Sequence, residues 1–265
     1  MKKALRKMII AVLVLILMLY GLVYLFQEKM IFFPEKLSTD YQFSFPQDFE
    51  EINLQTNDQK TLNGLLFKAQ NPKGLIFYLH GNAGALDSWA EVAPTYTRLG
   101  YDVFILDYRG FGKSSGRIHS QAQLFSDAQL AYSEMQKRYQ EDKIVVLGYS
   151  IGTGMASKIA ASNQPKMLIL QAPYFSLVDL IQHKFPIIPA FLIKYQLRTD
   201  QYLKECKMPV VIFHGDQDEV IYYESSLKLE KILKASDKMV TLKGQAHGGI
   251  TDNPVYLKVL AEILP

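Results

Sequence analysis

The feature that most limits how this chain can fold is an uncharged segment near its N-terminus. Residues 8–26 form a run of 19 residues without a charged side chain. As an α-helix, such a run is about 28 Å long at 1.5 Å per residue, which is enough to cross the hydrocarbon core of a bilayer. A buried core helix would not need the basic cluster that precedes this run. We therefore expect a transmembrane helix.

The flanks of this segment are typical of an uncleaved signal anchor. A cleaved signal peptide has an apolar region of about 7–15 residues that ends in a small-x-small site, whereas this run ends in Tyr-Leu-Phe. Four basic residues precede it: Lys2, Lys3, Arg6 and Lys7. By the positive-inside rule, the N-terminus is cytoplasmic and the rest of the chain lies outside the cell membrane. We predict an anchor at residues 1–33, with the transmembrane helix at residues 8–26.

The positive charge of the chain is concentrated in this anchor. The net charge is +3, but residues 1–33 contain five basic side chains and one acidic one, so the remainder is nearly neutral. A nucleic-acid-binding surface would need a basic patch, and we exclude that function. The single cysteine, Cys206, excludes an internal disulfide and a cysteine-based zinc site.

Beyond residue 45, short apolar runs alternate with amphipathic stretches, as in a mostly parallel sheet covered by helices. Residues 51–56 and 61–68 flank a turn signal and predict an antiparallel hairpin. Core strands, apolar on both faces, are expected at residues 75–79, 103–106, 144–147, 168–170, 210–213 and 239–242. Helices are expected at residues 86–99, 121–139, 153–162, 224–234 and 254–264. The pattern predicts one α/β domain at residues 34–265.

One long connection interrupts this alternation. Residues 172–208 lie between two expected strands and contain an apolar, proline-punctuated stretch at residues 185–193. A connection of this length usually has a function of its own. We interpret it as a short lid insertion, and the alternative is a helix that covers the core.

A candidate nucleophile lies between an expected strand and an expected helix. Residues 148–152 read G-Y-S-I-G, and a strand-turn-helix context is what a nucleophile elbow requires. Gly148 and Gly152 would let the chain turn sharply at Ser150, since a side chain there would collide with the neighbouring strand or helix. We predict Ser150 as the nucleophile, with Tyr149 beside it in the elbow. The alternative is a tight turn that merely contains a serine.

The loop after the expected strand 75–79 reads H-G-N-A-G at residues 80–84. In an elbow-type site, one oxyanion donor is the main-chain N–H after the nucleophile, here Ile151, and the other comes from an earlier loop. We assign the second donor to Asn82. For His80 we prefer a structural role, bracing the loop by hydrogen bonds.

An acid and a base are expected after two later strands. Residues 214–220 read H-G-D-Q-D-E-V, and a carboxylate there would orient the catalytic imidazole. We favour Asp218 over Asp216, for which a capping or turn role is the alternative. His247, in a glycine-flanked loop, is the predicted general base. The other histidines lie at strand ends, before a helix or in the lid: His80, His214, His119 and His183.

The order Ser150, Asp218, His247 is that of α/β-hydrolases. The chain resembles this superfamily, and specifically its membrane-anchored serine aminopeptidase-like or α/β-hydrolase-domain branch. The motifs that carry the resemblance are H-G-N-A-G (80–84), D-Y-R-G-F-G-K-S-S-G (107–116), G-Y-S-I-G (148–152) and H-G-D-Q-D-E-V (214–220). The loop before His247 departs from the family, which more often has Gly-His or Gly-x-Gly-His. The resemblance implies a sheet of about eight strands and a structural role for the turn at residues 107–110.

The motifs and the resemblance imply acyl transfer to water without a metal or cofactor. Relatives in this branch include lipid and lysolipid hydrolases, protein depalmitoylases and peptidases. The anchor and the apolar lid favour a lipid-like or acylated ester or thioester as the substrate, with the membrane as the other partner. A serine peptidase acting on amides is the alternative within the same chemistry. A noncatalytic ligand-binding protein on the same fold is the alternative of another class.

Overall fold

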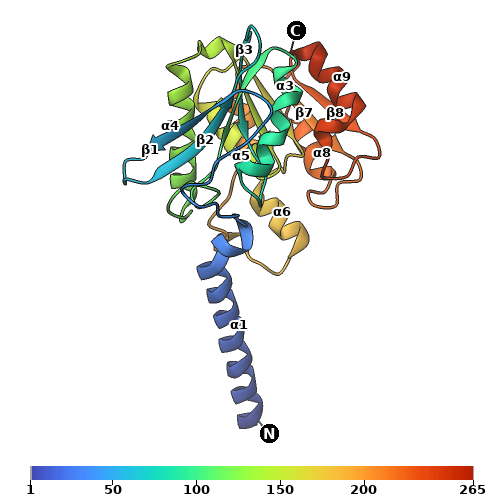
Figure 1. Cartoon of the computed structure of the whole chain (residues 1–265). Helices are drawn as coiled ribbons and strands as arrows, with labels where there is room; N and C mark the ends of the chain where they lie inside the picture. The colour runs from blue at the N-terminus through green and yellow to red at the C-terminus, as the bar shows by residue number, and fades with distance from the viewer. Residues whose placement is uncertain (1, 265) are drawn as a thin grey trace.

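An eight-stranded sheet forms the centre of the body of the protein in a computed structural model, which describes residues 2–264 (Figure 1). The strands are β1 Phe49–Gln55, β2 Thr61–Phe67, β3 Gly74–Leu79, β4 Tyr101–Leu106, β5 Ile144–Tyr149, β6 Met167–Gln171, β7 Val210–Gly215 and β8 Lys238–Leu242. Their order is β1-β2-β4-β3-β5-β6-β7-β8. Strand β2 is antiparallel to β1 and β4, and all other neighbours are parallel. The predicted mostly parallel sheet with an N-terminal hairpin is confirmed.

Helices cover both faces of this sheet. The helices of the described residues are α1 Lys2–Ile31, which projects away from the sheet, and α2 Leu86–Trp89, α3 Ala93–Thr97, α4 Gln121–Gln136, α5 Gly152–Ser162, α6 Leu177–Lys184, α7 Thr199–Glu205, α8 Glu224–Glu230 and α9 Pro254–Ile263. One apolar cluster joins the sheet to α4 and α5, through residues such as Leu124 and Met155. A second cluster joins the opposite face to α2, α3 and α9, through residues such as Tyr96 and Leu260. Each face of the sheet is thereby buried, as its apolar strands require.

Three of the expected helices differ from the structure, and one of them, expected at residues 121–139, ends at Gln136. The predicted single helix at residues 86–99 is divided into α2, a 3₁₀ turn at Ala90–Val92, and α3. Pro94 lies in the first turn of α3, where proline is tolerated because that turn needs no intrahelical N–H donor. The helix predicted at residues 224–234 ends earlier, at Glu230.

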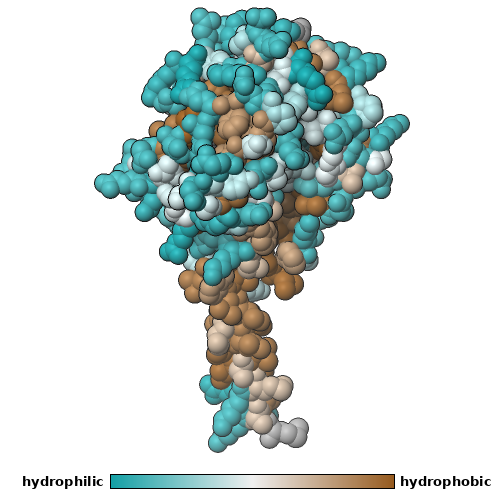
Figure 2. All heavy atoms as spheres, in the orientation of Figure 1, coloured by the Kyte–Doolittle hydropathy of each residue, from teal (hydrophilic) through white to brown (hydrophobic). Residues whose placement is uncertain are grey.

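Helix α1 protrudes from the body as a single long rod (Figure 1). It has 30 residues, and it is long and apolar enough to cross a membrane. Its apolar side chains are exposed along most of the rod, and polar surface returns at its N-terminal end (Figure 2). The helix extends beyond the expected residues 8–26 at both ends, and residues 27–31 still belong to α1.

The C-terminal part of α1 is hydrogen-bonded to the segment at residues 185–195. The side chain of Gln27 is buried, donates to the carbonyl oxygen of Leu192 at 2.6 Å and accepts from the main-chain N–H of Lys194 at 2.9 Å. The hydroxyl of Tyr20 donates to the carbonyl oxygen of Ile187 at 3.0 Å. After α1, the chain forms β-bridges with two loops of the body, Pro34 with Gly84 and Lys36 with Gly112. The helix is therefore held by hydrogen bonds and not only by its covalent link.

The residues at 107–116 form a structural turn around a buried arginine. Arg109 donates in bidentate fashion to Asp58, in the β1–β2 turn, and to Asp127 of α4, with the shortest distance to each carboxylate being 2.6 Å. Two charge-assisted pairs of this kind hold the hairpin against α4. We retain a structural interpretation of this turn.

Candidate active site

Ser150 lies at the sharp turn between β5 and α5. Its φ angle is 51°, in the left-handed region that a non-glycine residue rarely adopts, and its N–H donates to the carbonyl oxygen of Gln171 at 2.9 Å. The neighbouring glycines leave no room for a side chain. A Cβ atom at Gly152 would lie 2.1 Å from the carbonyl oxygen of Leu79, and one at Gly148 would also collide with α5. The surrounding structure thus holds Ser150 in a strained conformation.

The structure brings Ser150, His247 and Asp218 into one hydrogen-bonded series. His247 Nε2 lies 3.0 Å from Ser150 Oγ, and His247 Nδ1 lies 2.7 Å from Asp218 Oδ2. The loop of His247 is also held by Tyr149, whose hydroxyl donates to the carbonyl oxygen of His247 at 2.7 Å. This arrangement can transfer a proton from the serine hydroxyl to the imidazole.

Asp218 is surrounded by hydrogen-bond donors. Its Oδ1 accepts from the N–H groups of Val220 at 2.9 Å and Ile221 at 2.8 Å. Burial alone raises the pKa of the Asp218 carboxyl, but hydrogen bonds from His214 and His247 and the charge of His247 outweigh it and lower that pKa below its ordinary value. Asp218 is therefore a carboxylate at neutral pH, suited to orient an imidazole.

The other candidates occupy different positions. The carboxylate of Asp216 accepts a hydrogen bond from the N–H of Gly244 at 2.6 Å. This contact joins two loops and does not involve the imidazole of His247. His80 is fully buried, with Nδ1 2.7 Å from the carbonyl oxygen of Gly81 and its ring 4.3 Å from that of Tyr108. It braces the loop, as the sequence indicates.

His214 is a neighbour of Asp218 that the sequence pattern does not predict. His214 Nε2 lies 3.1 Å from Asp218 Oδ2 and 3.0 Å from the carbonyl oxygen of Ile221, while Nδ1 lies 2.5 Å from Ser226 Oγ. Because Nε2 faces two acceptors, the neutral tautomer with its proton on Nε2 fits these contacts. The signal available in the sequence was the i, i+4 spacing of His214 and Asp218 across the Gly-Asp-Gln turn.

Two main-chain N–H groups beside Ser150 have no acceptor. Among residues 2–264, neither the amide of Asn82 nor that of Ile151 donates to another group of the chain. Both residues line the same cavity as Ser150, which has a volume of about 240 Å³. Free amides next to a nucleophile can stabilise an oxyanion.

Most of the remaining lining of this cavity is apolar, apart from Lys184, and much of it comes from two distant parts of the chain. The end of α1 and the residues after it contribute Met30, Ile31 and Phe33. Helix α6 and the residue after it contribute Leu177, Leu180, Ile181 and Phe185. The second helix of the segment at residues 172–208, α7, instead packs on α5. Ser150 therefore faces apolar side chains of both α1 and α6.

The chain matches known proteins over most of its length. The serine aminopeptidase (S33) family matches residues 70–194. Protein bem46 of Schizosaccharomyces pombe is 32% identical, over 92% of this chain and 87% of that protein. The lysophosphatidylserine lipase ABHD12 of Mus musculus is 26% identical, over 80% of this chain and 60% of that protein.

Solved structures show the same fold. An esterase of Pyrococcus furiosus superimposes with a TM-score of 0.71 and 17% identity, covering 88% of this chain and 96% of that one. This likeness covers the central sheet and the helices on its faces. The chain belongs to the α/β-hydrolase superfamily.

Proposed function

We propose that this hydrolase is a membrane-anchored serine hydrolase that cleaves an acyl ester or thioester through an acyl-enzyme on Ser150. The observation that carries the proposal is the hydrogen-bonded series from Ser150 Oγ to His247 Nε2, at 3.0 Å, and from His247 Nδ1 to Asp218, at 2.7 Å. It supplies a nucleophile, a general base and an orienting carboxylate in the relation that covalent acyl transfer requires.

Each residue then has a defined step. His247 takes the proton of Ser150 as Oγ attacks the substrate carbonyl, and Asp218 stabilises the imidazolium that forms. The amides of Asn82 and Ile151 donate to the oxyanion of the tetrahedral intermediate. His247 returns the proton to the leaving oxygen or sulfur, which departs and leaves the acyl group on Ser150. A water molecule, deprotonated by His247, then releases the acid by the same route in reverse.

The apolar cavity supports a substrate with an acyl chain. Apolar side chains of α1 and α6 line the cavity of Ser150 and would contact the hydrocarbon of an acyl chain. A relative carries the name lysophosphatidylserine lipase, which agrees with an acyl ester. In this proposal the segment at residues 172–208 is a lid, of which α6 and the apolar loop after it form the part over the cavity.

The proposed topology follows from the anchor. Residues 1–33 act as the signal anchor, with the transmembrane helix at residues 8–26, and residues 34–265 form the hydrolase domain on the outer side of the cell membrane. A tag placed after Pro265 should be removed by protease added to intact cells with an accessible surface. A protected tag would contradict the outside orientation.

Labelling with a fluorophosphonate probe tests the nucleophile. The full-length protein should be labelled, and Ser150→Ala should not be, whereas Ser162→Ala, an exposed serine at the end of the same helix, should be labelled like the wild type. A wild type that does not react would favour a noncatalytic ligand-binding protein.

The substrate class is tested with synthetic substrates. We compare the rates of hydrolysis of p-nitrophenyl esters of increasing acyl length with those of aminoacyl amides. The comparison distinguishes an enzyme for lipid-like substrates from a peptidase. Rates should rise with acyl length as more hydrocarbon is buried in the cavity. Preference for the amides would favour the peptidase alternative.

A further inference from the structure

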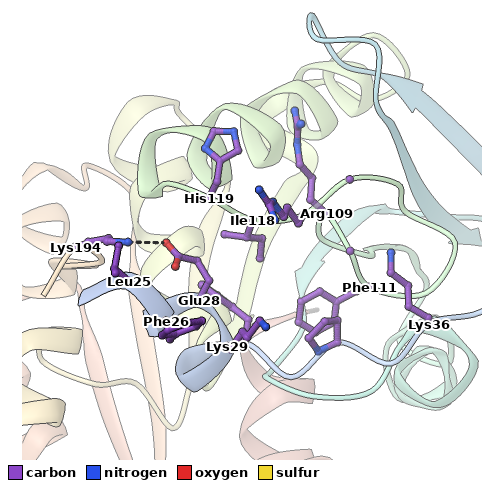
Figure 3. Close-up of a pocket in the computed structure, with 15 residues that line it drawn as sticks. Leu25, Phe26, Glu28, Lys29, Lys36, Arg109, Phe111, Ile118, His119 and Lys194 are labelled. Atoms are coloured by element: carbon purple, nitrogen blue, oxygen red, sulfur yellow. Dashed lines mark hydrogen bonds and ion pairs between the residues drawn. The ribbon is translucent and has the colours of Figure 1, made fainter. Parts of the chain in front are cut away.

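A second and larger cavity lies beside the end of α1 (Figure 3). Its volume is about 580 Å³. It is bounded by α1, by the segment that follows α1, by the loop at residues 109–119 and by Lys194. It shares no lining residue with the cavity of Ser150, so the proposed reaction gives it no role.

The polar part of this cavity is cationic. Arg109 is neutralised by Asp58 and Asp127, and Lys194 lies 3.4 Å from Glu28. Three further cations line the cavity without a carboxylate partner among residues 2–264: Lys29, Lys36 and Arg117. Figure 3 shows Lys29 and Lys36 on either side of Phe111. An uncompensated cluster of this kind fits an anionic group.

Burial supports the same conclusion for Lys36. The pKa of its ammonium group is lowered, because partial burial disfavours the charged form more than the carboxylate of Asp107 favours it. Its hydrogen bond within the chain goes to a neutral acceptor, the carbonyl oxygen of Ser114, at 3.1 Å. An anion in the cavity would offset this cost of burial.

The apolar part of the cavity continues onto the exposed surface of α1. Leu25 is 66% exposed and Phe26 is 46% exposed, and both line the cavity together with Ile118. These two residues end the proposed transmembrane segment, so the cations beside them lie at the level of lipid headgroups. A soluble anion would use the cations only, whereas a lipid would cover the exposed apolar side chains of α1 as well.

We propose that this cavity binds the headgroup of an anionic glycerophospholipid from the surrounding bilayer. Lys29, Lys36 and Arg117 contact the phosphate and its substituent, and the acyl chains lie along Leu25 and Phe26. The proposal rests on the membrane insertion of α1 proposed above, and it is independent of hydrolysis at Ser150.

Photocrosslinking in lipid nanodiscs tests this site. Full-length protein is placed in phosphatidylcholine discs that contain a small fraction of phosphatidylglycerol with a diazirine at the start of one acyl chain, and labelled peptides are mapped by mass spectrometry. Labels should concentrate on residues 22–36 and 109–119. They should exceed those from the matching photoreactive phosphatidylcholine by at least about fivefold, which is the effect of one of the three cations beside an anionic headgroup.

Matched variants decide whether the three cations are responsible. The triple variant Lys29→Gln, Lys36→Gln, Arg117→Gln should lower labelling by phosphatidylglycerol to the level of phosphatidylcholine. A control that neutralises three exposed lysines away from the cavity, at Lys73, Lys137 and Lys238, should leave it unchanged. Equal labelling by both lipids, or an unchanged triple variant, overturns the proposal.

Two further measurements separate the possible failures. Loss of labelling when inorganic phosphate is added would mean that the cavity takes a soluble anion, which overturns the lipid assignment. A protein that does not copurify with the discs would overturn the membrane insertion on which the proposal depends. Fluorophosphonate labelling of Ser150 in the same sample reports on the proposed hydrolase separately.

Discussion

The side-chain amide nitrogen of Asn82 donates a hydrogen bond to the carbonyl oxygen of Ile31, at a distance of 2.5 Å. The side-chain oxygen of Asn82 accepts from the N–H of Phe33 at 3.1 Å. Ile31 is the last residue of α1, and the main-chain amide of Asn82 is one of the two proposed oxyanion donors. The end of α1 is therefore bonded directly to the loop that would stabilise the reaction intermediate.

Replacing this side chain should slow the chemical step. Asn82→Ala keeps the main-chain amide but loses both contacts with α1, so the amide is held less firmly in place. Since small displacements of a catalytic group cost up to about 100-fold in rate, we expect kcat to fall by about tenfold or more. Steady-state hydrolysis of a p-nitrophenyl ester measures kcat. Gln42→Ala is the control, because the side chain of Gln42 donates to the nearby carbonyl oxygen of Asp40 and not to α1. An unchanged kcat would mean that the contacts with α1 do not position the amide.

The two aspartates after β7 should differ sharply in their effect. Asp218→Asn removes the carboxylate that orients His247, and kcat/KM should fall by about 10⁴-fold. Asp216→Asn alters only a turn contact with Gly244, and kcat/KM should stay within about threefold of the wild type. Similar losses in both variants would contradict the assignment of Asp218 as the acid.

The lowered pKa of Asp218 predicts how stability depends on pH. A carboxyl group whose pKa is lower in the folded state stabilises the fold above the pKa of the unfolded chain, about 3.9, and this contribution is lost as the pH falls through the folded pKa. The difference in unfolding free energy between wild type and Asp218→Asn should shrink as the pH falls below about 4. Urea titrations across this range measure it, and a difference that grows toward acid pH would contradict the prediction.

Two glycines near the site should respond differently to alanine. A Cβ atom at Gly152 would lie 2.1 Å from the carbonyl oxygen of Leu79, whereas one at Gly248 has no heavy atom within 4 Å. Gly152→Ala should lower the free energy of unfolding by about 1–3 kcal/mol or more. Gly248→Ala should change it by less than about 0.5 kcal/mol. Denaturant titration of both variants compares them, and equal stability would show that α5 can move away from β3.

The attachment of α1 can be tested by hydrogen exchange. Gln27→Ala removes the two hydrogen bonds that join α1 to Leu192 and Lys194. Amide exchange should accelerate at residues 185–195, while that of β5 and α5 should stay unchanged. If residues 185–195 exchanged at the same rate in the variant as in the wild type, other contacts would be holding this segment.

The strands and the order of the motifs were predictable because their signals are local. Runs that are apolar on both faces marked the parallel strands, and the motifs follow those strands where their carboxyl ends share one edge of the sheet. This placement explains why Ser150, Asp218 and His247, far apart in the chain, lie together in the structure. Their catalytic role stays a prediction until the variants are measured.

The features that were not predicted depend on contacts between distant residues. Gln27 and Leu192 are separated by 165 positions. In the sequence, the polar side chain of Gln27 directly after an apolar run is the only indication that it has a hydrogen-bond partner. The sequence places His214 only at the end of a strand, because its approach to Asp218 depends on how the intervening loop folds back. The division of the helix at residues 86–99 had a local signal, Pro94, which the apolar pattern outweighed.

The hydrogen bonds of Gln27, Tyr20 and Asn82 have a consequence for how the enzyme would meet its substrate. A flexible linker would let a domain reorient freely above the membrane. A helix that is hydrogen-bonded to its domain instead fixes the distance of that domain from the membrane and its tilt. With α1 across a bilayer, the serine would be confined to a thin layer next to the lipid. Its encounters would become a search in two dimensions, and turnover would follow the mole fraction of substrate in the membrane rather than its concentration in bulk water.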